Sequence, residues 1–80
     1  MRIPRDLSGL ELIKLLHKYG YNISKQRGSH IKITTQENGE HHLAIPNHNP
    51  LKIGTLNGII TKVSNHFSLT KNQVLENLFN

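Results

Sequence analysis

Residues 30–45 read His-Ile-Lys-Ile-Thr-Thr-Gln-Glu-Asn-Gly-Glu-His-His-Leu-Ala-Ile, and this stretch decides the fold. Apolar and polar residues alternate on both sides of an Asn-Gly pair, which predicts two half-buried strands joined by a tight hairpin turn. Along the first strand, His30 and Lys32 fall on the polar face. The apolar face receives four aliphatic residues: Ile31, Ile33, Leu43 and Ile45. The stretch therefore predicts an antiparallel hairpin with one face on a core and the other open to solvent or a partner.

A third strand is predicted just upstream of this hairpin. From residue 21 to residue 26 the alternation continues, with Tyr21 and Ile23 on the apolar side. The segment Arg27-Gly28-Ser29 then turns the chain back into His30. On this register, the polar face of the sheet presents six residues: Ser24, Gln26, His30, Lys32, Thr34 and His42.

Three helices are predicted to flank the strands. Ser8-Gly9-Leu10-Glu11 has the form of a capping box, and apolar residues then recur at helical spacing until Gly20, which ends the helix. A second helix is predicted from about Ile53 to His66, with Gly58 packed closely against the sheet. Its apolar stripe comprises Ile53, Leu56, Ile59, Ile60, Val63 and Phe67. Thr70-Lys71-Asn72-Gln73 repeats the capping pattern and predicts a short third helix.

Together these elements predict an α+β fold in the order α-β-β-β-α, with a short C-terminal helix added. A chain of 80 residues has room for one core, so we expect residues 1–80 to form a single domain. The economical arrangement is a three-stranded antiparallel sheet with both main helices on its apolar face. The apolar face of the third helix either folds back onto the domain or packs on a second copy in a homo-oligomer, and the sequence leaves both open.

Composition narrows the class of partner. Ten Lys and Arg residues stand against five Asp and Glu residues, giving a net charge of +5 and a pI of about 9.9, which favours a polyanion or an acidic protein partner. The chain has no cysteine, so it has no disulfide and no thiolate metal site. It contains no signal peptide and no apolar run long enough to cross a bilayer, so we expect a cytoplasmic protein with no membrane partner.

His30 is the candidate catalytic residue. An imidazole titrates near neutrality, and RNA carries its own nucleophile in the 2′-hydroxyl, so a histidine with cationic neighbours can cut RNA without a metal or another cofactor. Neighbouring cations would stabilise the extra negative charge of the transition state, and Gly28 would let the backbone approach a phosphate. The candidate RNA contacts are Lys25, Arg27, Gly28, Ser29, Lys32 and His48.

The other histidines are less informative. His48 lies in the loop before the second helix, where it could donate to a phosphate or simply stabilise the turn. No metal site is predicted, because the adjacent residues His41 and His42 point to opposite faces of a strand and the remaining histidines lie on different elements. No Walker-type loop or dinucleotide fingerprint is present.

Three short motifs occur in a recognisable order. They are Lys18-Tyr19-Gly20-Tyr21, Gln26-Arg27-Gly28-Ser29-His30, and Ile45-Pro46-Asn47-His48 followed by Leu51-Lys52-Ile53-Gly54-Thr55-Leu56. In this combination the chain resembles, over roughly residues 7–67, the HicA mRNA interferase toxins, also called the YcfA-like family. Residues 68–80 lie outside the resemblance.

The resemblance implies a double-stranded-RNA-binding-domain-like fold and an endoribonuclease that cleaves mRNA and so inhibits translation. The family's catalytic histidine falls on His30. The resemblance also implies a type II toxin-antitoxin system, in which a HicB-type antitoxin binds the toxin and blocks this site. The basic composition is suited to an acidic antitoxin as well as to RNA.

Two other classes of function stay open at this point. The first is a non-catalytic RNA-binding module of the double-stranded-RNA-binding-domain type, which would use cations near the second helix such as Lys52 and Lys62. The second is a protein-interaction domain whose basic face meets an acidic partner, and this class predicts no salt-sensitive affinity for RNA.

Overall fold

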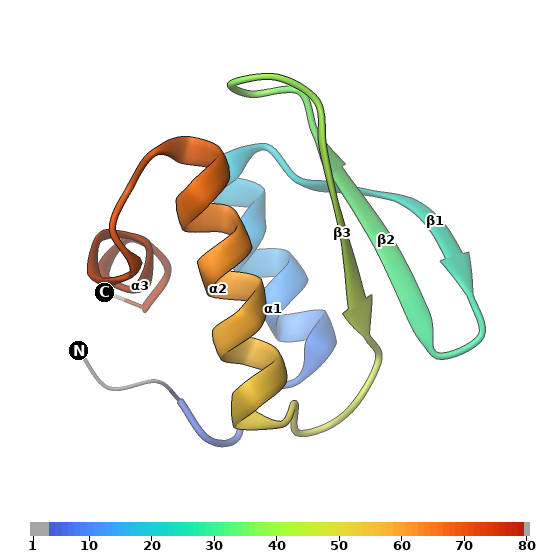
Figure 1. The fold of residues 1–80 in the computed structure, drawn as a ribbon. Helices are drawn as coiled ribbons and strands as arrows, with labels where there is room; N and C mark the ends of the chain where they lie inside the picture. The colour runs from blue at the N-terminus through green and yellow to red at the C-terminus, as the bar shows by residue number, and fades with distance from the viewer. Residues whose placement is uncertain (1–3, 80) are drawn as a thin grey trace.

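The computed structural model describes residues 4–79, which form three α-helices and a three-stranded sheet (Figure 1). In chain order the elements are α1 (Gly9–Leu16), the 3-10 turn η1 (His17–Tyr19), β1 (Asn22–Arg27), β2 (His30–Thr35), β3 (His41–Pro46), α2 (Ile53–Phe67) and α3 (Lys71–Phe79). The sheet is antiparallel with the strand order β1-β2-β3. The predicted α+β fold with an added C-terminal helix is therefore confirmed. Within residues 4–79, no helix has the length and apolar character needed to span a bilayer.

The helical segment made of α1 and η1 begins and ends where local chemistry predicts. The Ser8 hydroxyl accepts a hydrogen bond from the Glu11 amide at 3.1 Å, and the Glu11 carboxylate accepts one from the Ser8 amide at 2.9 Å, which completes the capping box. These hydrogen bonds from Ser8 hold the pKa of Glu11 below its usual value. After η1, Gly20 ends the helical segment in the left-handed region, with φ at 82°.

The hairpin between β2 and β3 turns at the predicted Asn-Gly pair, but the connection is the loop of residues 36–40 and not a two-residue turn, because the last strand pair is Thr35 with His41. Asn38 and Gly39 both have positive φ, at 57° and 96°, a conformation that Asn and Gly adopt at the least cost. The Asn38 side chain donates to the His66 carbonyl in the last turn of α2 at 2.7 Å. The tip of the hairpin is therefore tied to the helical layer.

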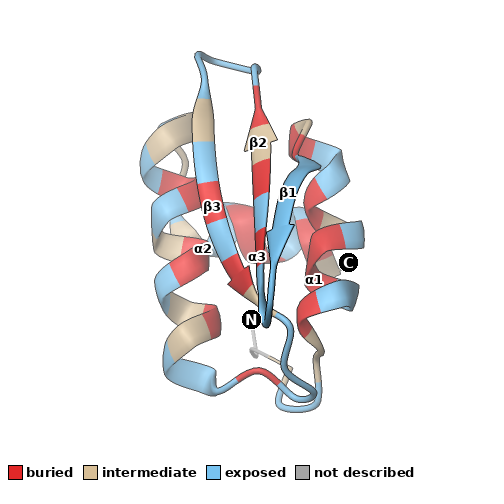
Figure 2. Ribbon diagram, turned by 90° about the vertical axis from the view of Figure 1, so that its right-hand side faces the viewer, coloured by how far each residue is buried: buried red, intermediate tan, exposed pale blue. Residues whose placement is uncertain are grey.

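Helices α1 and α2 cover one face of the sheet and leave the other uncovered (Figures 1 and 2). On the central strand β2, Ile31 and Ile33 are fully buried while His30 and Lys32 are exposed. Figure 2 shows this alternation along β2, and it also shows that the edge strand β1 is exposed throughout. The sheet, α1 and α2 supply most of the core: Leu12, Ile13, Leu16, Tyr21, Ile31, Ile33, Leu43, Ile45, Leu56, Ile59, Ile60 and Val63.

Two residues assigned to the apolar face by the sequence are exposed instead. Ile23 keeps 51% of its surface because it lies on the edge strand, where α1 leaves an open groove beside it. Ile53 keeps 40% because it is the first residue of α2, and the buried stripe of this helix starts one turn later at Leu56. The predicted face of Ile23 is right, because Ile23 pairs with the buried residue Ile33. The expected burial of Ile23 and Ile53 is wrong for one reason, since periodicity does not say where a covering element ends.

Helix α3 folds back onto the domain, which decides between the two alternatives that the sequence left open. Its apolar residues Val74, Leu75 and Leu78 are buried in the same core as α1 and α2. The Lys18 ammonium also donates to the Asn77 carbonyl at 2.6 Å. The apolar face of α3 is therefore covered within one chain, beside α2 and away from the sheet (Figure 1).

Two glycines differ sharply in their surroundings. Gly9 is buried at the start of α1, where its amide donates to the His48 carbonyl at 2.9 Å and an added Cβ would overlap the Pro46 carbonyl oxygen. Gly58 is exposed on α2, and an added Cβ would meet no atom within 4 Å. The predicted close packing of Gly58 against the sheet is therefore wrong, and close packing instead occurs at Gly9.

We expect Gly9→Ala to destabilise the protein by roughly 1–3 kcal/mol, because the methyl group forces α1 away from the end of β3. Gly58→Ala is the matched control and should stabilise by about 0.5–1 kcal/mol, since alanine is the better residue in an open helix interior. Urea unfolding followed by circular dichroism measures both. Equal effects of the two substitutions would contradict this assignment of the contact between α1 and β3.

Candidate functional site

His30 opens β2 directly after a two-residue turn. Arg27 and His30 are cross-strand partners, so Gly28 and Ser29 alone connect the strands. Gly28 has a positive φ of 57°, as the first central residue of a type II′ hairpin turn requires. The His30 side chain is exposed on the sheet face that α1 and α2 leave uncovered.

Strand β1 contains one residue more than β2 can pair. Ile23 pairs with Ile33, but Lys25 pairs with Lys32, so Ser24 has no partner and forms a β-bulge. Cross-strand partners lie on the same face of a sheet. The bulge therefore reverses the alternation of β1 for every residue that follows Ser24.

This reversal changes which residues share a face with His30. Arg27 pairs with His30 itself, and Lys25 pairs with the next outward residue of β2, so both cations lie on the uncovered face. Gln26 pairs with Ile31 and thereby belongs to the helix side, so its predicted place on the polar face is wrong. The signal that could have revealed the bulge is the glycine at the start of a two-residue turn, because that turn forces Arg27 to pair with His30.

Four exposed residues, here named the basic cluster, form two adjacent cross-strand pairs: Lys25 with Lys32 and Arg27 with His30. Lys25 and Lys32 are like charges directly opposite each other, which destabilises a strand pair, so fold stability does not explain this pair. Within residues 4–79 the one close contact between a carboxylate and a basic or histidine side chain, that of Glu40 with His42, involves none of the four. The basic cluster is therefore a surface that a multiply charged anion would neutralise.

The loop that carries His48 lies against the turn before His30. The Asn47 amide donates to the Ser29 carbonyl at 2.6 Å, and the Gly9 amide donates to the His48 carbonyl at 2.9 Å. The β3 partner of His30 is only two residues before His48. The structure thus brings both histidines to the same end of the sheet, and neither side chain forms a hydrogen bond within the part of the chain that is described.

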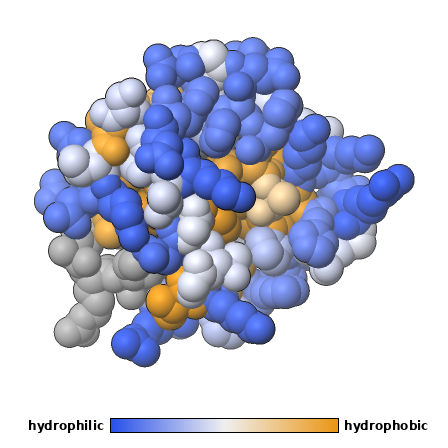
Figure 3. All heavy atoms as spheres, viewed as in Figure 1, coloured by the Kyte–Doolittle hydropathy of each residue, from blue (hydrophilic) through white to orange (hydrophobic). Residues whose placement is uncertain are grey.

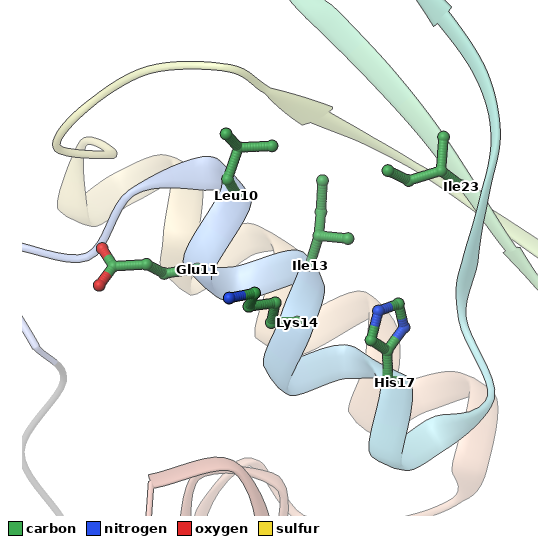
Figure 4. A pocket seen from close by; sticks show the side chains of 6 residues that line it. All are labelled: Leu10, Glu11, Ile13, Lys14, His17 and Ile23. Carbon is green, nitrogen blue, oxygen red and sulfur yellow. The ribbon is translucent and has the colours of Figure 1, made fainter.

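An apolar groove of about 340 Å³ lies on the other side of β1 (Figure 4), lined by Leu10, Glu11, Ile13, Lys14, His17 and Ile23. The side chains of Leu10, Ile13 and Ile23 point into the space between α1 and β1. Because Ile23 belongs to the helix side of the sheet, the groove opens away from the basic cluster. On the side of the molecule that Figure 3 shows, hydrophilic side chains predominate around an apolar area near the centre.

Two further histidines hold the hairpin against α2. The rings of His41 and His66 are stacked, with their centroids 4.3 Å apart and their planes 10° apart. His66 Nε2 donates to the carbonyls of Glu37 and Gly39 at 2.9 and 3.1 Å. His41 Nδ1 and the Tyr21 hydroxyl are hydrogen-bonded at 2.7 Å. These contacts give both histidines a structural role, and within residues 4–79 no group of three or more His, Asp or Glu side chains is placed to hold a metal ion.

Burial also shapes the ionisation of this structural cluster. Desolvation lowers the pKa of His41 below its usual value, and the charges of His66, His42 and Lys62 lower it further. Burial raises the pKa of Tyr21 to about 12. The folded state therefore favours the neutral form of both groups.

Comparison with known proteins gives one family. A family model described as "HicA toxin of bacterial toxin-antitoxin" matches residues 9–64, which is more than half of the 80-residue chain. The match runs from α1 through most of α2 and includes the whole sheet, the basic cluster and the His48 loop. No curated protein and no solved structure matches the chain.

We expect the protein to lose stability as the pH falls below 6.5, the ordinary pKa of an unfolded histidine, because the unfolded chain then takes up a proton that folded His41 resists. His41 thus contributes stability above this pH, and the contribution is lost on acidification toward its lower folded pKa. His41→Gln should flatten the pH dependence of the melting temperature between about pH 7 and pH 5. His48→Gln, which removes an exposed imidazole from a loop, provides the comparison variant.

Proposed function

Because this chain belongs to the HicA toxin family of bacterial toxin-antitoxin systems, we propose that it is an endoribonuclease that cleaves mRNA, with His30 as general acid or base. The observation that carries the proposal is the position of His30 within the basic cluster, on a sheet face that no helix covers. An mRNA substrate places the proposed activity in the cytoplasm.

The chemistry follows from the substrate and from these side chains. The 2′-hydroxyl of RNA attacks the adjacent phosphate once a base removes its proton, and general acid-base help is worth about 10² to 10⁴-fold. His30 is exposed and able to exchange that proton with a bound strand. Lys32 and Arg27 lie on the same face and are placed to stabilise the additional negative charge of the phosphorane. A metal ion is not needed for this route, because the nucleophile belongs to the substrate.

The remaining proposed contacts surround His30. Lys25 extends the basic cluster along β1, and the backbone of Gly28 and Ser29 forms the turn at its edge. His48, at the same end of the sheet, is proposed to contact a phosphate of the bound strand. In this arrangement all the proposed donors lie on one side of the scissile phosphate. The RNA would therefore lie across an open surface and not in a cleft.

The proposed partner is a HicB-type antitoxin that neutralises the toxin by covering the basic cluster. An acidic partner surface would remove the like-charge repulsion between the paired cations. A homo-oligomer through α3 is not part of the proposal, because the apolar face of this helix is already buried in the core.

The alternative is a non-catalytic RNA-binding module of the double-stranded-RNA-binding-domain type. That mode would bind phosphates through Lys52, the N-cap residue of α2, and Lys62 within α2, and not through the strand residues of the basic cluster. The two functions therefore use residues of different elements, β1 and β2 in one case and the start and middle of α2 in the other. Substitutions in either set separate them.

We predict that His30→Ala lowers the rate of mRNA cleavage in EDTA by at least about 100-fold while RNA affinity is largely retained, since it removes a proton-transfer group and little positive charge. A labelled mRNA in a single-turnover assay measures the rate, and circular dichroism checks the fold. His17→Gln, on the helix side, is the matched control and should cleave like wild type. Wild-type cleavage by His30→Ala would remove His30 from the mechanism.

The ends of the products test the proposed nucleophile. Attack by the 2′-hydroxyl leaves a 2′,3′-cyclic phosphate and a 5′-hydroxyl, whereas a 5′-phosphate would show that water attacked instead. If neither wild type nor variant cleaves and both bind RNA in a salt-dependent way, the non-catalytic module is the better reading.

A second prediction concerns the face that binds RNA. Lys32→Gln should reduce the salt dependence of affinity for a single-stranded RNA by about 0.7 in the slope of log K against log salt, the value of one phosphate contact. Lys52→Gln removes an exposed lysine from the start of α2 and should leave the slope unchanged. A larger effect of Lys52→Gln than of Lys32→Gln would favour the alternative.

A further inference from the structure

A chain of hydrogen bonds crosses all three strands on the uncovered face. The Ser24 and Thr34 hydroxyls are 2.8 Å apart, and the Thr34 hydroxyl is 2.8 Å from His42 Nδ1. His42 Nε2 donates to the Glu40 carboxylate at 2.9 Å. The Ser24 hydroxyl also donates to the Lys32 carbonyl at 3.3 Å. We call Ser24, Thr34, His42 and Glu40 the polar chain.

A donor and an acceptor can be assigned to every hydrogen bond of the polar chain. With Nε2–H of His42 donating to Glu40, Nδ1 is free to accept from the Thr34 hydroxyl. The Thr34 oxygen can then accept from Ser24, whose hydroxyl is shared with the carbonyl of Lys32. Hydrogen bonds from Gln36 and His42 also lower the pKa of Glu40, so its carboxylate remains the charged end of the chain.

The polar chain does not take part in proton transfer at His30. Thr34 and His42 are partners four residues along the strands from His30 and its partner, and a strand rises about 3.3 Å per residue. The separation is therefore too large for the imidazoles of His30 and His42 to act on one phosphate. A different role follows from the one member of the chain that lies on β1, because Ser24 is the bulged residue.

Two constraints require β1 to contain one residue that has no partner on β2, but they do not determine which residue it is. The two-residue turn pairs Arg27 with His30, while Ile23 pairs with Ile33 on the helix side. The extra residue can be placed anywhere between these pairs. With Gln26 as the extra residue, Lys25 would pair with Ile31 and turn toward the helices, whereas Arg27 would stay on the outer face. The location of the bulge thus decides the positions of Ser24, Lys25 and Gln26, and Lys25 is the one cation among them.

We propose that the polar chain fixes the bulge at Ser24 and so positions Lys25 beside Lys32 in the RNA-binding face. The hydroxyl of Ser24 is held by Thr34, which is in turn held through His42 by the charged carboxylate of Glu40. The hydrogen bonds of the polar chain compensate for the repulsion between Lys25 and Lys32, which lie directly opposite each other. The four residues of the polar chain are positioning residues. The inference rests on the proposed function in one respect, the role of Lys25 in binding RNA.

The register of β1 is tested without RNA. Thr34→Val keeps the shape of the side chain and removes the hydroxyl that links β1 to β3, so the cross-strand nuclear Overhauser contacts between Lys25 and Lys32 should weaken or disappear. Thr34→Ser restores the hydroxyl and should restore these contacts. Thr61→Val removes a hydroxyl from α2 and is the matched control. Ser24→Ala, which breaks the chain at its other end, should reproduce the effect of Thr34→Val and serves if that variant does not fold.

The consequence for RNA is tested with poly(U) and glutamine substitutions in two backgrounds. In wild type, Lys25→Gln and Arg27→Gln should each reduce the salt slope by about 0.7. In the Thr34→Val background, Arg27→Gln should still do so, whereas Lys25→Gln should have little further effect because Lys25 has already left the face. Arg27 is thus the internal control, since the turn and not the polar chain sets its position.

The results of these experiments distinguish a failure of the positioning role from a failure of the proposed function. Unchanged contacts between Lys25 and Lys32 in both Thr34→Val and Ser24→Ala would overturn the positioning role, whatever the protein does to RNA. An equal effect of Lys25→Gln in both backgrounds would overturn it as well. The Lys25–Lys32 contacts could be lost in Thr34→Val and Ser24→Ala while the wild-type protein neither binds nor cleaves RNA. This outcome would support the role of the polar chain in fixing the register of β1 and would contradict the proposed function.

Discussion

The burial of Ile31 and Ile33 on the central strand is the constraint on which the rest of the structure depends. Both side chains are fully buried beneath α1 and α2, and burial of such a side chain contributes about 1.5–3 kcal/mol. Because side chains alternate along a strand, this burial holds His30 and Lys32 outward. A slip of one residue would expose the isoleucines and bury an imidazole and an ammonium group. The register that forms the core therefore also forms the candidate site.

The edge strand β1 meets two requirements that a regular strand cannot satisfy together. The turn at Gly28 pairs Arg27 with His30, while Ile23 pairs with Ile33 on the helix side. The bulge reconciles the two by adding one residue, and it bends β1 at the edge of the sheet. Its result is a pair of opposed lysines, which costs stability in the isolated protein. Such a local conflict is typical of functional surfaces, where fold and function ask for different residues.

The six histidines of the chain divide according to their hydrogen bonds. His17, His41 and His66 bond to backbone or side-chain groups of neighbouring elements, so they help to hold the fold together. His42 bonds to Thr34 and Glu40 within the polar chain. The imidazoles of His30 and His48 have no such bond within residues 4–79 and stand at one end of the sheet.

The sequence by itself determined the order of the elements, the central hairpin, the capped start of α1 and the outward position of His30. Each depends on neighbouring residues and on a period of 2 or 3.6, which are local properties. Only the tertiary structure decided that Lys25 and Arg27 join His30 while Gln26 does not, that α3 covers the core of its own chain, and that Gly58 is open. These depend on which segments pair and where a covering helix ends. A bulge changes the face of every later residue on its strand without changing the composition of that strand, so alternation alone could not reveal it.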